Sequence, residues 1–266
     1  MRALRAIGAA WSLLTIVPIP GALGRRLGPE DWSRSAAAFP LVGLVLAALL
    51  AVFGHVAVDA LGATAGAALT VAASAILTAG LHLDGLADAC DALGARGSGD
   101  DQRQRRLEIM RDSGTGTYGT LALIFALLLQ TTALATLAIA GGAAFALALL
   151  IALPLGRTAG IVHAAQLQPA RSSGLGASFA APPAALLVAG VLTVVLWGGA
   201  AAVWVADQDV LDAIDAPIMA VTGALLALGA TTRLARAKLG GRTGDTIGAT
   251  IVVAETLALL GFLALV

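Results

Sequence analysis

The sequence is poor in charged residues. Only 12% of its 266 residues are Asp, Glu, Lys or Arg, whereas a soluble domain usually carries about 25%. The 16 basic and 16 acidic residues leave no formal net charge, which excludes a strongly basic nucleic-acid-binding protein. The single cysteine, Cys90, excludes an internal disulfide and a metal site built from several cysteines.

Apolar residues are abundant instead. They make up 59% of the chain, the mean hydropathy is +0.91, and several apolar runs approach the length of about 20 residues that spans a bilayer. We predict an all-α fold: a polytopic integral membrane helix bundle of about seven transmembrane helices, forming a single membrane-embedded domain over residues 1–266. The expected spans are 36–58, 64–83, 118–140, 143–165, 182–204, 217–237 and 247–266. Their Ala and Gly content predicts close helix packing.

The N-terminal segment, residues 1–24, has two arginines, an apolar run and small residues, as a signal peptide does. Pro18 and Pro20 end the apolar run after about a dozen residues, which is short for a span. Because the rest of the chain is itself predicted to lie in the membrane, we favour a retained short interfacial or re-entrant segment.

Apart from Arg157, basic residues lie in alternate connections between the expected spans or at the adjoining span ends. They occur before residue 36, within 84–117, near residue 171 and within 233–242, while residues 206–216 carry only acidic charges. The positive-inside rule then places every basic segment on the cytoplasmic side. We therefore predict a protein of the bacterial plasma membrane with its N-terminus inside and its C-terminus outside.

The first acidic motif is LHLDGLADACDAL, residues 81–93. Asp84, Asp88 and Asp91 are spaced i, i+4 and i+7, which puts them within an arc of about 60° on one helix face. Three like charges on one stripe repel each other, and Mg²⁺ with its preference for carboxylate oxygens would compensate them. The alternative is the solvated face of an interfacial helix.

The second motif is RRLEIMRDSGTGTYG, residues 105–119. Glu108 and Asp112 are again four residues apart, and Arg105 and Arg111 flank the same predicted helix face. The glycines that follow could form an anion-binding turn, so the motif suits a metal-bound phosphate or diphosphate. The alternative is a salt-bridged amphipathic segment on the membrane surface.

The third motif is LGGRTGDTIGAT, residues 239–250. Asp245 stands among glycines, with Arg242, Thr243 and Gly244 close by, in a loop that could wrap an anion or add a metal ligand. The alternative is a Gly-rich turn before a helix that Thr243 or Asp245 caps.

Arg157, His163 and Glu255 are ionisable residues inside the expected spans. Arg157 is a functional candidate because charges at membrane depth are rare, although it could instead snorkel toward the cytoplasm. We expect His163 to be a satisfied core group, and Glu255 has no assigned partner. Because all three acidic motifs map to one side of the membrane, the sequence favours metal-dependent chemistry on a phosphorylated substrate.

The ordered segments LLTIVPIP, AAFPLVGLV, GLHLDGLADACDAL, RRLEIMRDSGTGTYG and LGGRTGDTIGA resemble the motifs of the cobalamin synthase family. That family is also called adenosylcobinamide-GDP ribazoletransferase, and the resemblance covers nearly the whole chain. It implies a membrane enzyme that joins adenosylcobinamide-GDP to α-ribazole or α-ribazole 5′-phosphate, releases GMP and uses Mg²⁺. Gly114 departs from the family pattern, in which a larger, often basic residue is expected.

The resemblance also implies roles for residues. Asp84, Asp88 and Asp91 would hold the metal and the diphosphate, and Glu108, Asp112 or Asp245 would act as the base toward the incoming hydroxyl. The expected substrate-binding residues are Arg105, Arg111, Arg157, Arg242, Thr243 and Gly244. The active site would face the cytoplasm, with membrane lipid around the protein and no nucleic-acid partner; a homo-oligomer is left open.

Two other functions share part of this pattern. A CDP-alcohol phosphatidyltransferase also uses an aspartate-rich membrane site, but its signature places an arginine after Asp-Gly, where this chain has Leu86-Ala87-Asp88. A secondary transporter would carry acidic residues near mid-span and an inverted repeat. Here most carboxylates are predicted at span ends.

Overall fold

The computed structural model describes residues 2–19, 27–95, 99–112, 114–179, 181–207 and 214–266. Within these ranges the chain is helical and contains no strand, only an isolated bridge between Pro169 and Arg242. The prediction of an all-α membrane helix bundle is therefore confirmed. The basic residues 25, 26 and 96, which contributed to the orientation argument, lie outside the described residues.

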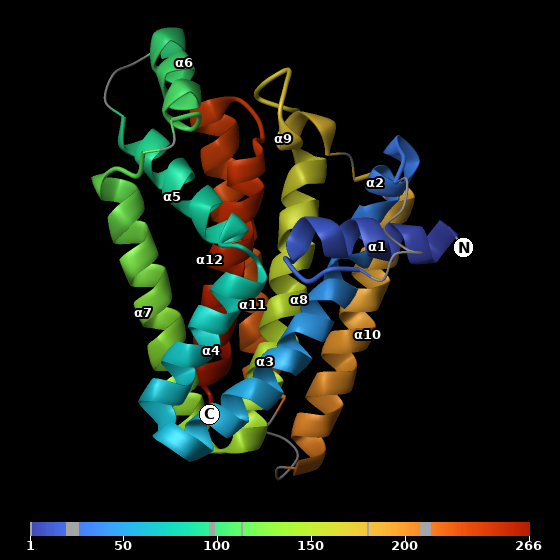
Figure 1. Ribbon diagram of the computed structural model, residues 1–266, viewed down its shortest axis with the longest axis vertical. Coiled ribbons are helices and arrows are strands. Elements are labelled where there is room, and N and C mark those ends of the chain that lie inside the picture. Colours follow the sequence, from blue (N-terminus) through green and yellow to red (C-terminus); the bar gives the residue numbers. More distant parts are fainter. Residues whose placement is uncertain (1, 20–26, 96–98, 113, 180, 208–213) are drawn as a thin grey trace.

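Figure 1 shows the order of the helices along the chain. They are α1 (Arg2–Leu14), α2 (Pro29–Ser35), η1 (Ala36–Ala38), α3 (Phe39–Leu61), α4 (Ala63–Leu77), α5 (Leu81–Gly94), α6 (Gly99–Ile109), α7 (Thr117–Ala140), α8 (Gly142–Gln166), α9 (Leu175–Ser178), α10 (Pro183–Asp207), α11 (Asp215–Leu234), η2 (Ala235–Leu239) and α12 (Gly244–Leu263).

Six of the described helical segments are long and apolar enough to cross a membrane, and the bent pair α4–α5 raises the number to seven. The six helices match six of the expected spans closely. α1 is a short helix that lies across the bundle while the long helices run along it (Figure 1), as expected for an interfacial segment. Large apolar side chains such as Val52, Phe125 and Leu187 are exposed on the outside of the bundle, where lipid would cover them.

The expected second span, 64–83, is not one continuous helix, so this prediction was wrong. α4 ends at Leu77, α5 begins at Leu81, and the two helices are bent by 89° at the break. Between them Ala79 and Gly80 have φ values of 52° and 66°, in the left-handed region that a right-handed helix cannot continue through. α5 therefore starts inside the bundle and rises toward the end that carries α6 (Figure 1).

Small residues allow the central helices to touch backbone to backbone. A Cβ atom at Gly43 in α3 would lie 2.9 Å from the Leu153 carbonyl oxygen of α8, and one at Gly223 in α11 would collide with the Leu257 carbonyl oxygen of α12. This confirms the expected close packing. α8 and α12 are the most buried spans, and they place the start of α12 at the centre of one end of the bundle.

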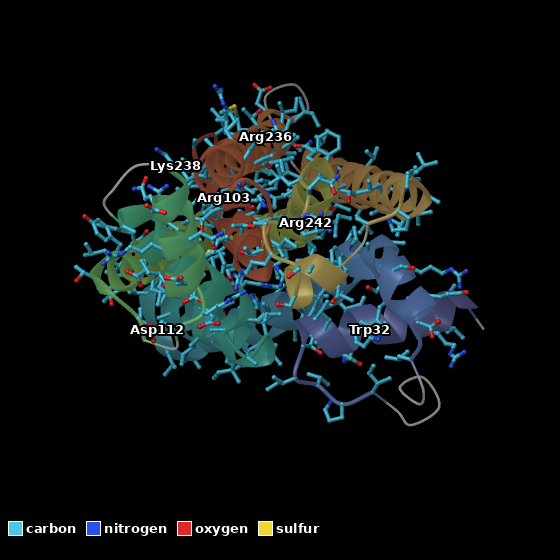
Figure 2. The ribbon with its side chains drawn as sticks, turned by 90° about the horizontal axis from the view of Figure 1, so that it is seen from above. Trp32, Arg103, Asp112, Arg236, Lys238 and Arg242 are labelled. Carbon is cyan, nitrogen blue, oxygen red and sulfur yellow. The ribbon has the colours of Figure 1, made fainter. Side chains whose placement is uncertain are left out.

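That end also gathers the basic side chains. Figure 2 shows Arg103, Arg236, Lys238 and Arg242 over α6, η2 and the start of α12. The opposite end carries the C-terminus (Figure 1). The two ends of the bundle therefore differ in charge, as the distribution of basic segments predicts.

Candidate functional site

The first acidic motif lies on α5. Asp84, Asp88 and Asp91 all fall within this one helix, which confirms the predicted helical spacing. Asp84 is exposed, and the other two are half-buried. The charges that act on Asp88 come from Asp84, Asp91, Asp245 and Arg171, so the acidic face of α5 lies within electrostatic range of the start of α12.

Helices α5 and α12 contact each other through backbone atoms. A Cβ atom at Gly85 would lie 2.7 Å from the Asp245 carbonyl oxygen, and one at Gly248 would lie 3.3 Å from the His82 Cα atom. Any side chain at Gly85 would therefore separate the helices. This packing brings the first and third motifs together and places Asp84 and Asp245 on the wall of one cavity.

The start of α12 is held by a network of hydroxyl groups. Thr243 is the N-cap: its Oγ1 accepts from the Thr246 amide at 3.1 Å, and Thr246 Oγ1 accepts from the Thr243 amide at 3.0 Å. His163 of α8 contacts Thr246 Oγ1 and Thr232 Oγ1, both at 3.0 Å. The alternative interpretation of the third motif, a turn capped by Thr243 before a helix, is therefore confirmed. His163 is a core residue with hydrogen-bond partners, as we expected.

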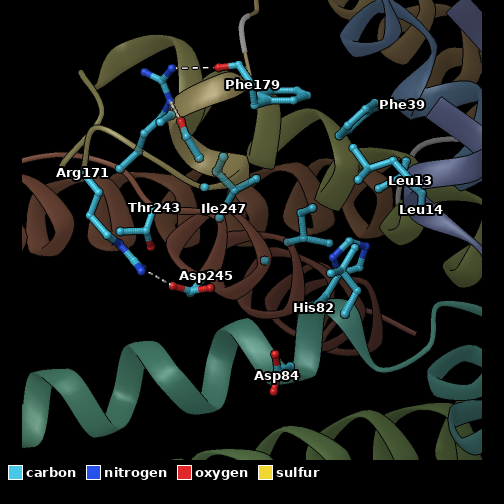
Figure 3. Close-up of a pocket in the computed structure, with 18 of the residues that line it drawn as sticks. Leu13, Leu14, Phe39, His82, Asp84, Arg171, Phe179, Thr243, Asp245 and Ile247 are labelled. Atoms are coloured by element: carbon cyan, nitrogen blue, oxygen red, sulfur yellow. Dashed lines mark hydrogen bonds and ion pairs between the residues drawn. The ribbon is translucent and has the colours of Figure 1, made fainter. Parts of the chain in front are cut away.

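The cavity has a volume of about 250 Å³ (Figure 3). Its polar side is formed by Asp84, Arg171, Asp245 and the cap of α12, and Arg171 Nη2 donates to Asp245 Oδ2 at 2.6 Å. The opposite side is apolar and is lined by Leu13, Leu14, Phe39 and Phe179. The cavity is therefore amphiphilic: Arg171 and Asp245 lie at one side, and the leucines and Phe39 lie at the other, next to His82 (Figure 3).

Arg171 was missed as a site residue at the sequence level, where it served only as a charge marker for topology. Its position is set by pairing between two loops: the Arg242 amide donates to the Gln168 carbonyl at 2.9 Å, and the Ala170 amide donates to the Arg242 carbonyl at 2.8 Å. This short bridge carries Arg171 over the start of α12. A lone arginine in an otherwise uncharged connection was the available signal.

Arg242 has a different environment from the one we expected. Its guanidinium donates to the backbone carbonyls of Gly176 at 3.1 Å, Phe179 at 2.8 Å and Leu167. Burial lowers the pKa of the Arg242 guanidinium, but an arginine remains charged at neutral pH. Arg242 lines the cavity while holding the 167–179 segment in place, so its contacts show a positioning role.

Asp91 also has protein partners. Its Oδ2 accepts from the Gly116 amide at 2.7 Å and its Oδ1 from the Gly119 amide at 2.9 Å. Gly116 is the N-cap of α7, so Asp91 caps that helix from α5. Two amides of the Gly-rich turn, which we expected to suit a phosphate, therefore donate to the Asp91 carboxylate.

The remaining residues of the second motif do not line the cavity. Glu108 lies on α6, which ends at Ile109, so Asp112 falls in the turn that follows. The predicted continuous helix face through Glu108 and Asp112 is therefore wrong. Both carboxylates and the side chains of Arg105 and Arg111 are exposed, and Asp112 accepts from the Gly114 amide at 3.1 Å. Figure 2 shows Asp112 at the edge of the basic end.

Arg157 lies in the core of the bundle, away from the cavity walls. It is 1% exposed and forms an ion pair with Glu255 of α12. The pair gives Glu255 the partner that the sequence did not identify. It also places Arg157 between α8 and α12, and Arg157 does not line the cavity.

Asp84 and Asp88 are the carboxylates near the cavity that could bind a metal ion. No three His, Cys, Asp or Glu side chains in the described part of the chain converge into a ready-made metal cage. Asp84 and Asp88 accept no hydrogen bond from any described residue, and they are one helical turn apart. Mg²⁺ usually takes one or two carboxylates and completes its shell with water and substrate phosphate, so this pair fits a Mg²⁺ that arrives with a phosphorylated substrate.

Comparisons with known proteins identify the relatives of the chain. The family model described as cobalamin-5-phosphate synthase matches residues 6–263. An adenosylcobinamide-GDP ribazoletransferase of Azorhizobium caulinodans is 38% identical over 98% of this chain and 96% of the relative. One of Citrobacter koseri is 36% identical over 95% of this chain and 98% of the relative. No solved structure matches the chain significantly.

The matches cover the whole described site, from α1 to the end of α12. They give no support to a CDP-alcohol phosphatidyltransferase or to a transporter. With its α5 and α12 acidic motifs meeting at one cavity, this chain belongs to the cobalamin-5-phosphate synthase family.

Proposed function

We propose that the protein is an adenosylcobinamide-GDP ribazoletransferase acting late in cobalamin biosynthesis. The relatives that carry this name match the chain over nearly their full length. The observation that supports the proposal most strongly is the meeting of Asp84, Arg171 and Asp245 at one amphiphilic cavity. Such a cavity suits a reaction between a diphosphate and a nucleoside that carries an aromatic base.

The proposed reaction is a displacement at phosphorus. The ribose 3′ oxygen of α-ribazole, or of its 5′-phosphate, bonds to the phosphorus that carries cobinamide. The bond from that phosphorus to the bridging oxygen breaks, GMP leaves with that oxygen, and the hydroxyl proton passes to a carboxylate. The products are adenosylcobalamin, or its 5′-phosphate, and GMP.

We assign the base to Asp245. Glu108 and Asp112 were equal candidates at the sequence level, but of the three only Asp245 lines the cavity. A positioned carboxylate contributes about 10²–10⁴-fold to such a proton transfer. Arg171 and the amide groups at the start of α12, near Thr243 and Gly244, would hold phosphate oxygens, because a helix N-terminus attracts anions.

Asp84 and Asp88 would hold Mg²⁺ together with the diphosphate. When bound, the ion would neutralise the charge that builds on the leaving GMP. Asp91 stays in this proposal as the residue that orients α5 by capping α7. We base the proposed orientation on charge: Arg171 and Arg242 line the cavity, Figure 2 shows Arg242 among the basic side chains of this end, and the positive-inside rule would place that end in the cytoplasm.

The proposal is tested with purified protein in liposomes, given adenosylcobinamide-GDP, α-ribazole 5′-phosphate and Mg²⁺. We expect GMP release together with a corrinoid product of the summed mass, and no release after Mg²⁺ is chelated. Asp84→Asn is expected to raise the half-saturating Mg²⁺ concentration at least tenfold. Asp59→Asn is the matched control, because Asp59 is an exposed carboxylate near the end of α3 that lines no part of this cavity.

Folded wild-type protein that forms neither product would overturn the proposal. Activity that persists without divalent ions, or an Asp84→Asn variant indistinguishable from Asp59→Asn, would keep the transferase and remove the metal from Asp84.

A further inference from the structure

The apolar side of the cavity is formed by side chains from three distant parts of the chain. Leu13 and Leu14 come from the end of α1, Phe39 from the start of α3, and Phe179 from the connection before α10. The two phenylalanine rings pack with their centroids 5.4 Å apart at 45°. In Figure 3 the leucines and Phe39 lie on the side of the cavity opposite Arg171.

This apolar wall is fixed to the catalytic helices. The Ile16 amide, two residues beyond α1, donates to the Leu77 carbonyl at 2.9 Å, at the end of α4 and next to the break before α5. Trp11 Nε1 donates to the Val17 carbonyl at 2.8 Å and closes the turn after α1. These hydrogen bonds fix the position of the end of α1 relative to the break before α5, the helix that carries Asp84.

The size of the cavity limits what the apolar side can hold. Pockets for drug-sized ligands measure about 300–1,000 Å³, and this one measures about 250 Å³. A corrin ring is far larger than a pocket of that size, whereas a bicyclic base with its ribose is not. The walls offer aliphatic and aromatic surfaces, which favour a flat apolar ring by burial and by ring stacking.

We propose that this apolar side binds the heteroaromatic base of the acceptor, and that Leu13 of α1 sets the largest base that fits. The inference rests on the proposed transferase function and extends it, because it assigns the acceptor rather than the donor to this half of the cavity. A base held here directs its ribose toward Asp84 and Asp245, at the polar side.

Leu13 is the residue to change, because it is only half-buried while Leu14 is buried in the core. Leu13→Phe fills the apolar side and Leu13→Ala enlarges it. Leu4→Phe is the matched control: Leu4 lies on the same helix, is 52% exposed and does not line the cavity. Each variant is assayed for GMP release with α-ribazole 5′-phosphate and with the analogue whose benzimidazole lacks both methyl groups.

We expect Leu13→Phe to lower kcat/KM for α-ribazole 5′-phosphate about tenfold or more, since small volume changes in an apolar pocket discriminate by that amount. The loss should be smaller for the unmethylated analogue, and KM for adenosylcobinamide-GDP should not change. Leu13→Ala should reduce the difference in kcat/KM between the two acceptors. Leu4→Phe should have the kcat/KM values of the wild type. Titration of each folded variant with free 5,6-dimethylbenzimidazole gives a second readout: Leu13→Phe should weaken its binding.

Equal losses for both acceptors, or a raised KM for the donor instead, would overturn the assignment of the base to this wall. So would unchanged kinetics in both Leu13 variants. If the wild type releases no GMP from any pair of substrates, the transferase proposal itself fails, and that result is distinct from a wild type that is active but insensitive to Leu13.

Discussion

Replacing Asp91 separates its two assigned roles, metal ligand and helix cap. In the structure both carboxylate oxygens accept backbone amides at the start of α7, at 2.7 and 2.9 Å. Removing an N-cap costs about 0.5–2 kcal/mol, and hydrogen bonds to a charged group contribute about 1.5–3 kcal/mol each. One of the two bonds is exposed, which reduces its share. We therefore expect Asp91→Ala to destabilise the protein by about 2 kcal/mol.

The assay is thermal unfolding in detergent, run beside a Mg²⁺ titration of GMP release. A loss of about 2 kcal/mol lowers the melting temperature by roughly 4–8 °C in a chain of this size. Asp91→Asn keeps one carbonyl acceptor and should lose about half as much. In both variants the half-saturating Mg²⁺ concentration should stay at the wild-type value. A tenfold rise in that concentration with an unchanged melting temperature would refute the capping role and restore Asp91 as a metal ligand.

Three further predictions concern other parts of the site and its frame. Arg171→Ala should raise KM for adenosylcobinamide-GDP about tenfold. Arg171→Lys should raise this KM less, because lysine keeps the positive charge but lacks the planar set of donors of a guanidinium group. An unchanged KM in Arg171→Ala would remove Arg171 from the phosphate site. Arg157→Ala should cost about 3–5 kcal/mol by leaving Glu255 charged and unpaired in the core, and the double variant Arg157→Met with Glu255→Leu should regain most of that stability in unfolding experiments. Ala79→Gly should stabilise the protein by about 1 kcal/mol, since its left-handed backbone strains a residue with a Cβ atom; a lower melting temperature would contradict the strained conformation.

The helix bundle could be predicted from the sequence because its signal is local. Runs of apolar residues set the spans, and the alternation of basic segments set their direction. The break between α4 and α5 could not be predicted in the same way. It depends on the left-handed backbone conformation of Ala79. Tertiary packing imposes this conformation, and an alanine in the sequence does not predict it.

The candidate site was predicted in part. The sequence motifs identified Asp84, Thr243 and Asp245, which all line the cavity. The first and third motifs meet there because α5 and α12 pack closely at Gly85. Arg171 and the apolar wall at Leu13 were missed, because their place depends on long-range pairing between loops and on how α1 lies across the bundle. Arg157 shows the opposite case: a buried charge that looked functional has its partner in Glu255.

The central claim is that Asp84 of α5 and Asp245 of α12 act in one site, and a double-mutant cycle tests it most directly. GMP release is measured for wild type, Asp84→Asn, Asp245→Asn and the double variant at saturating substrates and Mg²⁺. Residues that act as a unit lose activity non-additively, so the double variant should be no more than a fewfold slower than the slower single variant. Losses that multiply across the cycle, or an Asp245→Asn variant with wild-type activity, would contradict a shared site.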